Sequence, residues 1–382
     1  MSLKQFKNKE ALFIALIILV LLATCRTLII PLKGDELTYF KLAENILDGK
    51  YFLNEYPSTI APIIPIITAL FTVNFNPELG VLFNKLFNLI LVAGGFNYVY
   101  LIFRQIGVDK KIIRPIIVLT AINSVSISFF PSLYPEAMIF FGFWGFIYYS
   151  IQNVSSKNIL ITLCFFTLLI FTRYVFAVLG LILLIRYYEF SKSNFSKRLW
   201  KLIKYSLIFL IPVVLWSKYI YNIEKQNVSE ISYFDRFKGE SPIVYNLKAG
   251  LGIEKHFEVS RVNGIPAFAS LFIPVTGFRS YPMSIVLILS FIFGYITMLK
   301  SLEVKKIFFA IVLVMVGYMF AGTGFSRYWL PMLPGFIFGF YFLIKKFNVK
   351  TQWVVIASYC IAFLYLINEV RLNIKILTDY WG

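Results

Sequence analysis

Residues 11–30 read ALFIALIILVLLATCRTLII, and residues 34–43, shortly after them, read GDELTYFKLA. The first stretch is long and apolar enough to cross a bilayer, since a spanning helix needs about 20 predominantly apolar residues. The second stretch places two carboxylates, Asp35 and Glu36, just past that span and continues as an amphipathic run in place of a polar linker. Together the two stretches predict a membrane protein with acidic side chains held at the lipid interface.

The composition of the whole chain agrees with a membrane protein. Of 382 residues, 59% are hydrophobic, 19% aromatic and 15% charged, whereas soluble domains carry roughly 25% charged residues. Apolar segments are spread from Leu12 to Ile367. We therefore expect one all-α polytopic domain over residues 1–382, with no separate soluble module.

The positive charges of the chain predict its topology. The net charge is +18, and the Lys and Arg residues form short clusters between apolar segments, as in the cytoplasmic loops of membrane proteins. This distribution argues against nucleic-acid binding. With every cluster inside and the N-terminus cytoplasmic, we expect about eleven spanning helices and an outside C-terminus. The expected spans lie at about 11–30, 80–103, 112–130, 135–151, 158–172, 174–187, 202–220, 283–299, 307–323, 328–344 and 352–368.

Two segments do not fit a simple alternation of spans. Residues 58–73 would extend only about 24 Å as a helix, short of the roughly 30 Å hydrocarbon core, so we expect a re-entrant or interfacial helix there. Residues 158–187 are apolar except for Arg173. We expect two short helices that turn near this arginine, because one long helix would move the next basic cluster outside. The main outer loops are then 31–79, with interfacial helices, and 221–282.

This topology places the distinctive ionisable residues on the outer face, where they are candidates for function because charges at a membrane edge are costly. They include Asp35, Glu36, Glu136, Arg173 and Arg327. Simpler interpretations stay open: the acids complement helix dipoles, and the arginines extend to the lipid headgroups. Arginine is also well suited to binding a phosphate through two hydrogen bonds.

Four motifs follow one another along the chain. They are Asp35-Glu36-x-x-Tyr39-x-x-x-Ala43, with Gly49, Pro62 and Pro65 downstream; Ser132-Leu133-Tyr134-Pro135-Glu136; Phe171-Thr172-Arg173-Tyr174; and Arg327-Tyr328-Trp329-Leu330-Pro331-x-x-Pro334. In this order they resemble the motifs of the GT-C glycosyltransferases, of the protein O-mannosyltransferase and aminoarabinose-transferase type (glycosyltransferase family 39-like). The chain departs from that pattern with Tyr174 in place of a frequent Pro, with Glu136 in place of the commoner Asp, and in lacking a basic residue and double proline at 58–73.

The resemblance implies a GT-C-like helical bundle that transfers a sugar from a polyprenyl-phosphate donor to an acceptor at the extracytoplasmic face, with inversion. Asp35 is the expected general base, and the acceptor is a glycolipid, a glycan or a protein. The resemblance implies no cofactor; a divalent metal is possible but not predicted. The expected site residues are Asp35, Glu36 and Glu136 for catalysis, Arg327, Arg173 and Lys33 for the donor phosphate, and Tyr39, Tyr134 and Tyr328 for the substrate.

Two other classes of protein fit the same composition. A flippase or transporter of lipid-linked sugars would also be polytopic and basic inside, but transporters usually contain an internal repeat, and none is visible here. A non-catalytic scaffold would use the acidic pair only to cap a helix. The expected location of the enzyme is the bacterial inner or plasma membrane. Loop 221–282 is expected to cover the site with its aromatic residues. These are Tyr233, Phe234, Phe237, Tyr245, Phe257 and Phe268.

Overall fold

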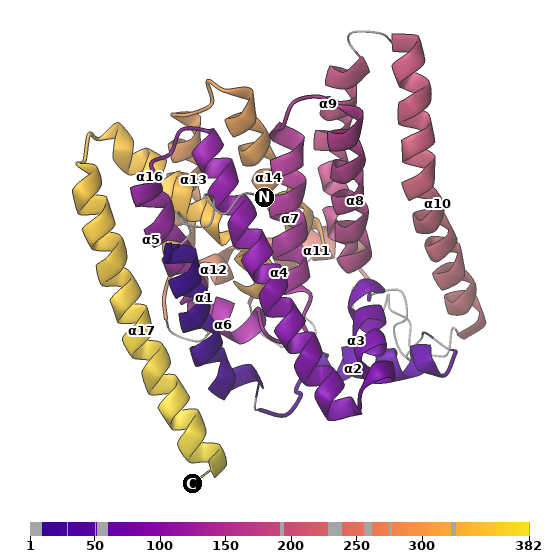
Figure 1. The fold of residues 1–382 in the computed structure, drawn as a ribbon, viewed down its shortest axis with the longest axis horizontal. Helices are drawn as coiled ribbons and strands as arrows, with labels where there is room; N and C mark the ends of the chain where they lie inside the picture. The colour runs from indigo at the N-terminus through magenta and orange to yellow at the C-terminus, as the bar shows by residue number, and fades with distance from the viewer. Residues whose placement is uncertain are drawn as a thin grey trace.

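The computed structural model describes most of the chain as helix. The described residues are 10–28, 30–49, 51, 60–191, 195–227, 239–255, 262–274, 277–321 and 326–381. Over these ranges, extended pairing is limited to one isolated bridge between Lys255 and Val262. Long helices stand side by side in a bundle, and two shorter ones, α2 and α3, lie at one end of it, with α3 packed against α4 (Figure 1). The all-α prediction is confirmed.

The long helices follow the predicted spans. Their bounds are α1 Glu10–Ala23 with the π-helical turn Thr24–Leu28, α4 Pro77–Gln105, α5 Lys110–Ala121, α7 Glu136–Ile151, α8 Ser156–Thr172, α9 Gly180–Ser191, α10 Phe195–Asn227, α13 Tyr281–Ile296, α14 Leu302–Phe320, α16 Leu333–Lys346 and α17 Thr351–Trp381. In the described part of the chain, four helices are long and apolar enough to cross a membrane: Pro77–Gln105, Trp200–Asn222, Ser326–Lys346 and Thr351–Asp379. The chain is a multi-pass membrane protein, and the count of about eleven spans stays a prediction.

The helices at the end of the bundle are α2, Asp35–Leu47, and α3, Ile63–Asn74. The residue before α2 is Gly34, whose φ of 57° lies in a region that side-chain-bearing residues rarely adopt. The two acids in the first turn of α2 then complement the dipole of the helix. At 1.5 Å per residue α3 is about 18 Å long, too short to span a bilayer. The sequence predicted a short helix of this kind, which does not span the bilayer, at 58–73.

The predicted break at Arg173 is confirmed. Helix α8 ends at Thr172, and Arg173 is extended, with φ −155° and ψ 124°. The chain continues as a 3₁₀ helix, Tyr174–Leu179, which packs against α8 and α14 before α9 begins. The break brings the arginine out of the helical ladder at the α2–α3 end of the bundle.

Two predicted spans differ from the helices found. The span 112–130 is divided into α5 and α6, Ser124–Phe129, because the Asn123 side chain accepts a hydrogen bond from the Val125 backbone and starts a new helix. The span 352–368 continues to residue 381 as part of α17. The apolar window ends near 368, yet Glu369 is fully buried, with an oxygen 2.7 Å from Arg26.

Loop 221–282 is partly helical, since α10 reaches residue 227 and α11, Pro242–Leu251, and α12, Ile265–Phe268, follow. Phe268 is fully buried against Trp329 and Phe336, and Tyr245 is 3% exposed. These two aromatic residues belong to the core, so their predicted role as a cover is wrong: their large apolar rings are more stable when packed. The other four predicted aromatic residues of this loop, Tyr233, Phe234, Phe237 and Phe257, lie outside the described residues.

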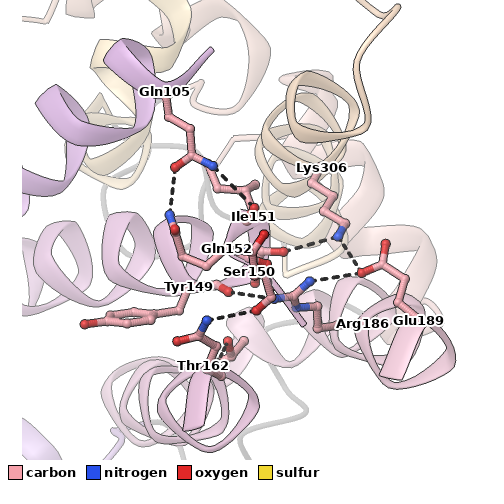
Figure 2. Close-up of polar contacts among 11 residues, drawn as sticks. Gln105, Tyr149, Ser150, Ile151, Gln152, Thr162, Arg186, Glu189 and Lys306 are labelled. Carbon is pink, nitrogen blue, oxygen red and sulfur yellow. Dashed lines mark hydrogen bonds and ion pairs between the residues drawn. The ribbon is translucent and has the colours of Figure 1, made fainter. Parts of the chain in front are cut away.

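Helix α7 lies in the middle of the bundle and is fixed at its C-terminal end by a buried polar cluster (Figure 2). Arg186 of α9 donates hydrogen bonds to the carbonyl groups of Gln152 and Asn153. Lys306 of α14 donates to the Ser150 carbonyl at 3.2 Å and to Glu189 at 2.8 Å. Cations at a helix C-terminus satisfy its unpaired carbonyls and complement its dipole. The cluster therefore holds α7, whose other end carries Glu136.

Candidate functional site

The site lies at the α2–α3 end of the bundle (Figure 1), where α2, the start of α7, the break after α8 and the short helix α15, Ser326–Trp329, meet. Its most exposed pair is Asp35 and Arg327. The Oδ2 atom of Asp35 accepts a hydrogen bond from Arg327 Nη2 at 2.5 Å. The Asp35 side chain is 51% exposed and that of Arg327 is 14% exposed, so the carboxylate is the open member of the pair.

A second, buried pair lies behind the first. Glu136 is fully buried, and its Oε1 atom is 2.9 Å from Arg173 Nη2 and 4.0 Å from Arg327 Nε. One buried carboxylate thus attracts both arginines, while Arg327 also faces the open carboxylate of Asp35. The other Glu136 oxygen is buried and accepts no hydrogen bond from the described part of the chain.

Aromatic rings hold the two guanidinium groups in place. The Arg327 Cζ atom lies 4.8 Å from the ring centre of Tyr134 and 5.0 Å from that of Tyr328. The Arg173 Cζ atom lies 4.0 Å from the Tyr328 ring, and Arg327 donates a hydrogen bond to the Tyr328 hydroxyl at 3.2 Å. These are cation–π distances. Both arginines therefore keep a defined position whichever anion they bind.

The tyrosines of the site are hydrogen-bond donors, not bases. Burial raises the pKa of Tyr134 to about 12, against the lowering effect of nearby Arg327. Burial also raises the pKa of Tyr39, whose ring packs edge-on to Tyr134 at 6.4 Å. Both phenols stay protonated near neutral pH and offer an O–H group to a ligand.

Glu36 contacts other groups than Asp35, its neighbour in the chain. It is 4% exposed, accepts a hydrogen bond from the Leu133 backbone at 3.0 Å and lies 3.9 Å from Lys85 Nζ. Glu36 thereby connects α2 to α4 and to the turn before α7. Lys33 is exposed, and its backbone nitrogen lies 3.4 Å from Glu36 Oε2. The acceptor and phosphate roles of these two residues stay predictions.

Sequence reasoning missed several residues of the site. Lys85 is 2% exposed inside the apolar helix α4, and a lone cation in a spanning segment is a signal that would have identified it. Tyr318 stacks on Tyr328 at 5.4 Å, and Phe129 packs against Tyr134 at 5.2 Å. Aromatic residues in apolar segments carry no comparable signal, because they are common in any membrane helix.

The charges of the site suit an anion better than a metal cation. Across the described ranges, no group of three or more His, Cys, Asp and Glu side chains is placed to hold a metal ion. Asp35 and Glu136 each face an arginine. Two fixed guanidinium groups beside two carboxylates leave positive charge available as soon as one carboxylate moves away.

No family model and no curated protein sequence matches the chain. Solved structures do match. The oligosaccharyltransferase AglB of Archaeoglobus fulgidus, in complex with an inhibitory peptide and a dolichol-phosphate, aligns with a TM-score of 0.50 and 13% identity over 98% of this chain and 56% of that one. A crystal structure of the A. fulgidus oligosaccharyltransferase with zinc and sulfate gives a TM-score of 0.52 and 13% identity over 95% and 52%.

The protein O-mannosyltransferase complex of S. cerevisiae bound to the sugar donor aligns with a TM-score of 0.44 and 14% identity, over 67% of this chain and 37% of that one. The chain thus spans about half the length of the oligosaccharyltransferase structures it matches. At this level of identity the likeness concerns the fold. The protein has the fold of the GT-C membrane glycosyltransferases.

Proposed function

We propose that the protein is a glycosyltransferase that transfers a sugar from a polyprenyl-phosphate donor to an acceptor at the extracytoplasmic face of the membrane. The observation that carries the proposal is the contact between the open carboxylate of Asp35 and the guanidinium of Arg327. Such a transfer needs a base for the acceptor and a cation for the departing phosphate. The GT-C fold supports the same class of reaction.

The chemistry assigns one task to each side chain. The acceptor hydroxyl or amine attacks the anomeric carbon from the face opposite the phosphate, and its proton passes to Asp35. The bond between the anomeric carbon and the phosphate oxygen breaks as the new bond forms, so the configuration inverts. The bonding electron pair leaves with the phosphate, whose charge is stabilised by Arg327, supported by Arg173 and more weakly by Lys33.

The resting contact between base and cation must open during this reaction. In an inverting transfer the sugar lies between the base and the leaving phosphate, whereas Asp35 Oδ2 and Arg327 Nη2 are 2.5 Å apart. The donor phosphate therefore replaces Asp35 on Arg327 and frees the carboxylate to act as base. Arg327 keeps its contact with the Tyr134 ring, and its Nε atom stays 4.0 Å from the buried Glu136 carboxylate. These contacts hold the guanidinium group in position during the exchange.

The tyrosines and buried acids complete the substrate site. Tyr39, Tyr134 and Tyr328 offer aromatic faces and protonated hydroxyls to a sugar ring. Glu136, with an oxygen that accepts no hydrogen bond from the described residues, is placed to orient an acceptor group as well as the two arginines. Glu36 orients Asp35 through its fixed contacts at the start of α2.

The charge distribution supports an extracytoplasmic site in a plasma or bacterial inner membrane. Lys110 and Lys111 at the start of α5, and Lys345 and Lys346 at the end of α16, lie at the end of the bundle opposite α2 and α3 (Figure 1). Under the positive-inside rule that end is cytoplasmic. The lipid tail of the donor then stays in the bilayer while its phosphate reaches Arg327.

The test is transfer by the purified protein in detergent, with lipid-linked sugars and acceptors extracted from the source membranes and products analysed by mass spectrometry. We expect a glycosylated product that Asp35→Asn abolishes. Glu44→Gln, which removes another exposed carboxylate of α2, is the matched control and should keep full activity. A flippase forms no product without a membrane, so absence of product with the unmodified protein would favour that alternative.

A further inference from the structure

An ion pair that the proposed reaction does not use lies buried between the first and the last helix. Glu369 of α17 has an oxygen 2.7 Å from Nη1 of Arg26, which belongs to the π-helical turn after α1. The Arg26 side chain is 9% exposed and that of Glu369 is 0% exposed. Charges within membrane segments are costly and commonly functional, and a buried ion pair is weak evidence for stability. The pair is therefore a candidate for a further role.

Both members of the pair contact the short helix α6. The Ser124 hydroxyl donates a hydrogen bond to Glu369 Oε1, and Arg26 Nη1 donates to the Ser128 hydroxyl at 3.2 Å. Residues four positions apart lie on the same face of a helix, so the ion pair holds one face of α6 near both of its ends. Ile127, on a different face of α6, is fully buried in the core.

Helix α6 needs support from its neighbours, because six residues are too few to form a stable helix by themselves. Its last residue, Phe129, reaches the candidate site. The ring centre of Phe129 lies 5.8 Å from the Arg327 Cζ atom and 5.2 Å from the ring centre of Tyr134. The position and rotation of α6 therefore set where the Phe129 ring lies, and with it the space that remains for the Arg327 guanidinium and the Tyr134 phenol.

We propose that Arg26 and Glu369 are positioning residues of the active site: their ion pair holds α6 so that Phe129 keeps Arg327 and Tyr134 aligned with the donor phosphate. This role rests on the proposed function, in which Arg327 binds that phosphate. Neither member of the pair touches the substrate. A change far from the chemistry that misplaces a reacting or binding group by about 1 Å can lower the rate by about 10²-fold.

A purely structural role for the pair would be to join α1 to α17, which lie side by side (Figure 1). The same two helices are joined a second time, because the Asn373 side chain donates a hydrogen bond to the Leu22 carbonyl at 3.0 Å. Helix α6 takes no part in this bond. Asn373→Leu is therefore a matched control that removes a buried contact between α1 and α17 and leaves the contacts of α6 in place.

The serine variant, Ser124→Ala/Ser128→Ala, tests the support of α6 directly. It removes both hydrogen bonds between α6 and the ion pair and leaves Arg26 and Glu369 paired. Amide hydrogen exchange of the full-length protein in detergent, without substrate, should become several-fold faster over α6 than in the unmodified protein, because the helix opens locally more often. Asn373→Leu should leave this exchange unchanged. Equal exchange over α6 in the serine variant and the unmodified protein would overturn the proposal.

Donor kinetics test whether the support of α6 matters for the reaction. In the serine variant, kcat/KM for the extracted donor, normalised to folded protein, should fall by roughly 10- to 100-fold, whereas the acceptor KM should stay the same. The apolar variant, Arg26→Met/Glu369→Met, should show the same loss, since apolar residues can replace a buried ion pair without loss of stability but hold neither serine. The reversed pair, Arg26→Glu/Glu369→Arg, should recover most of the rate, and Asn373→Leu should keep all of it.

Two kinetic outcomes would count against the proposal in different ways. A normal donor kcat/KM per folded protein in both the serine and the apolar variant would show that the pair is only structural, and would overturn the positioning role alone. Absence of transfer by the unmodified protein would overturn the proposed function, and the role at the donor phosphate with it. The exchange measurement needs no substrate, so it decides the support of α6 in either case.

Discussion

Asp35 and Arg327 are 292 positions apart in the chain, yet a carboxylate oxygen of one accepts a hydrogen bond from the other at 2.5 Å. The two groups that the proposed reaction needs as base and as phosphate ligand therefore neutralise each other before substrate binds. This arrangement avoids leaving a guanidinium that is 14% exposed without an anion. In the proposed reaction, donor binding is then an exchange in which the donor phosphate replaces the Asp35 carboxylate on Arg327.

The exchange predicts opposite effects of Asp35→Asn on binding and on turnover. An amide competes less strongly than a carboxylate for Arg327, so polyprenyl phosphate should bind the variant several-fold more tightly. Loss of the base should lower kcat by about 10²- to 10⁴-fold. Binding is measured by equilibrium titration with polyprenyl phosphate, and turnover by transfer with extracted donor.

Glu44→Gln on the same helix is the control and should change neither quantity. Weaker or unchanged binding of polyprenyl phosphate to Asp35→Asn would contradict the exchange, even if the variant were inactive.

Substitutions of Arg327 are expected to separate charge from shape. Arg327→Ala removes the phosphate ligand and should lower transfer by about 10²- to 10³-fold, the usual effect of removing one group that stabilises developing charge. Arg327→Lys keeps the charge but loses the planar group that lies over Tyr134 and Tyr328, so it should recover only part of the rate. Donor-concentration series measure both variants, and Arg104→Ala at the far end of α4 is the control. A kcat/KM for the donor that stays the same in both Arg327 variants would exclude it as a phosphate ligand.

Glu136 should behave as a structural as well as a functional residue. It is fully buried and pairs with Arg173 at 2.9 Å, and removing one partner of a buried pair costs about 3–5 kcal/mol. Glu136→Gln should therefore lower the unfolding temperature in detergent clearly, whereas Asp35→Asn, which changes a half-exposed side chain, should not. The double variant Glu136→Gln/Arg173→Gln should be more stable than the sum of the single effects predicts. Simple additivity would show that the two side chains are not energetically coupled.

Several features of the fold and site were predictable because their signals are local. An apolar span followed at once by Asp35 and Glu36 predicts a helix start at the interface, and α2 begins at Asp35. A single Arg173 within an apolar stretch predicts a break, and α8 ends one residue before it. Membrane topology then predicts that the separate motifs meet at one end of the bundle.

The pairing of charges was not predictable, because it depends on how each helix is rotated in the packed structure. Glu136 and Arg173 lie in different motifs, and nothing in either indicates that one carboxylate contacts both arginines. The length of α17 was missed for a related reason. In the sequence, Glu369 marks the end of an apolar segment, because nothing there indicates that Arg26, from the other end of the chain, lies beside it and pairs with its charge.

Tyr134 predicts a dependence of stability on alkaline pH. Its pKa in the folded protein, about 12, is above the ordinary value of 10.0 because of burial. A raised pKa means that the contribution of the protonated phenol is complete below pH 10 and is lost as the pH rises from 10 to 12. Tyr134→Phe cannot ionise, so its unfolding temperature should fall less over this interval than that of the unmodified protein. Parallel melting curves for the two proteins would refute the prediction.

The polar cluster at the far end of α7 (Figure 2) predicts an effect on stability without an effect on chemistry. Lys306 satisfies the Ser150 carbonyl and Glu189 from a position 6% exposed, and a buried group left without its partner costs about 1–3 kcal/mol. Lys306→Met should therefore lower the unfolding temperature. The folded fraction should still transfer sugar at the normal rate, because Glu136 at the other end of α7 keeps its own contacts with Arg173. Transfer rates normalised to folded protein measure this difference, with the exposed Lys305→Met as the control. A large loss of normalised rate in Lys306→Met alone would show that the two ends of α7 are coupled, and that the cluster positions Glu136 through the helix.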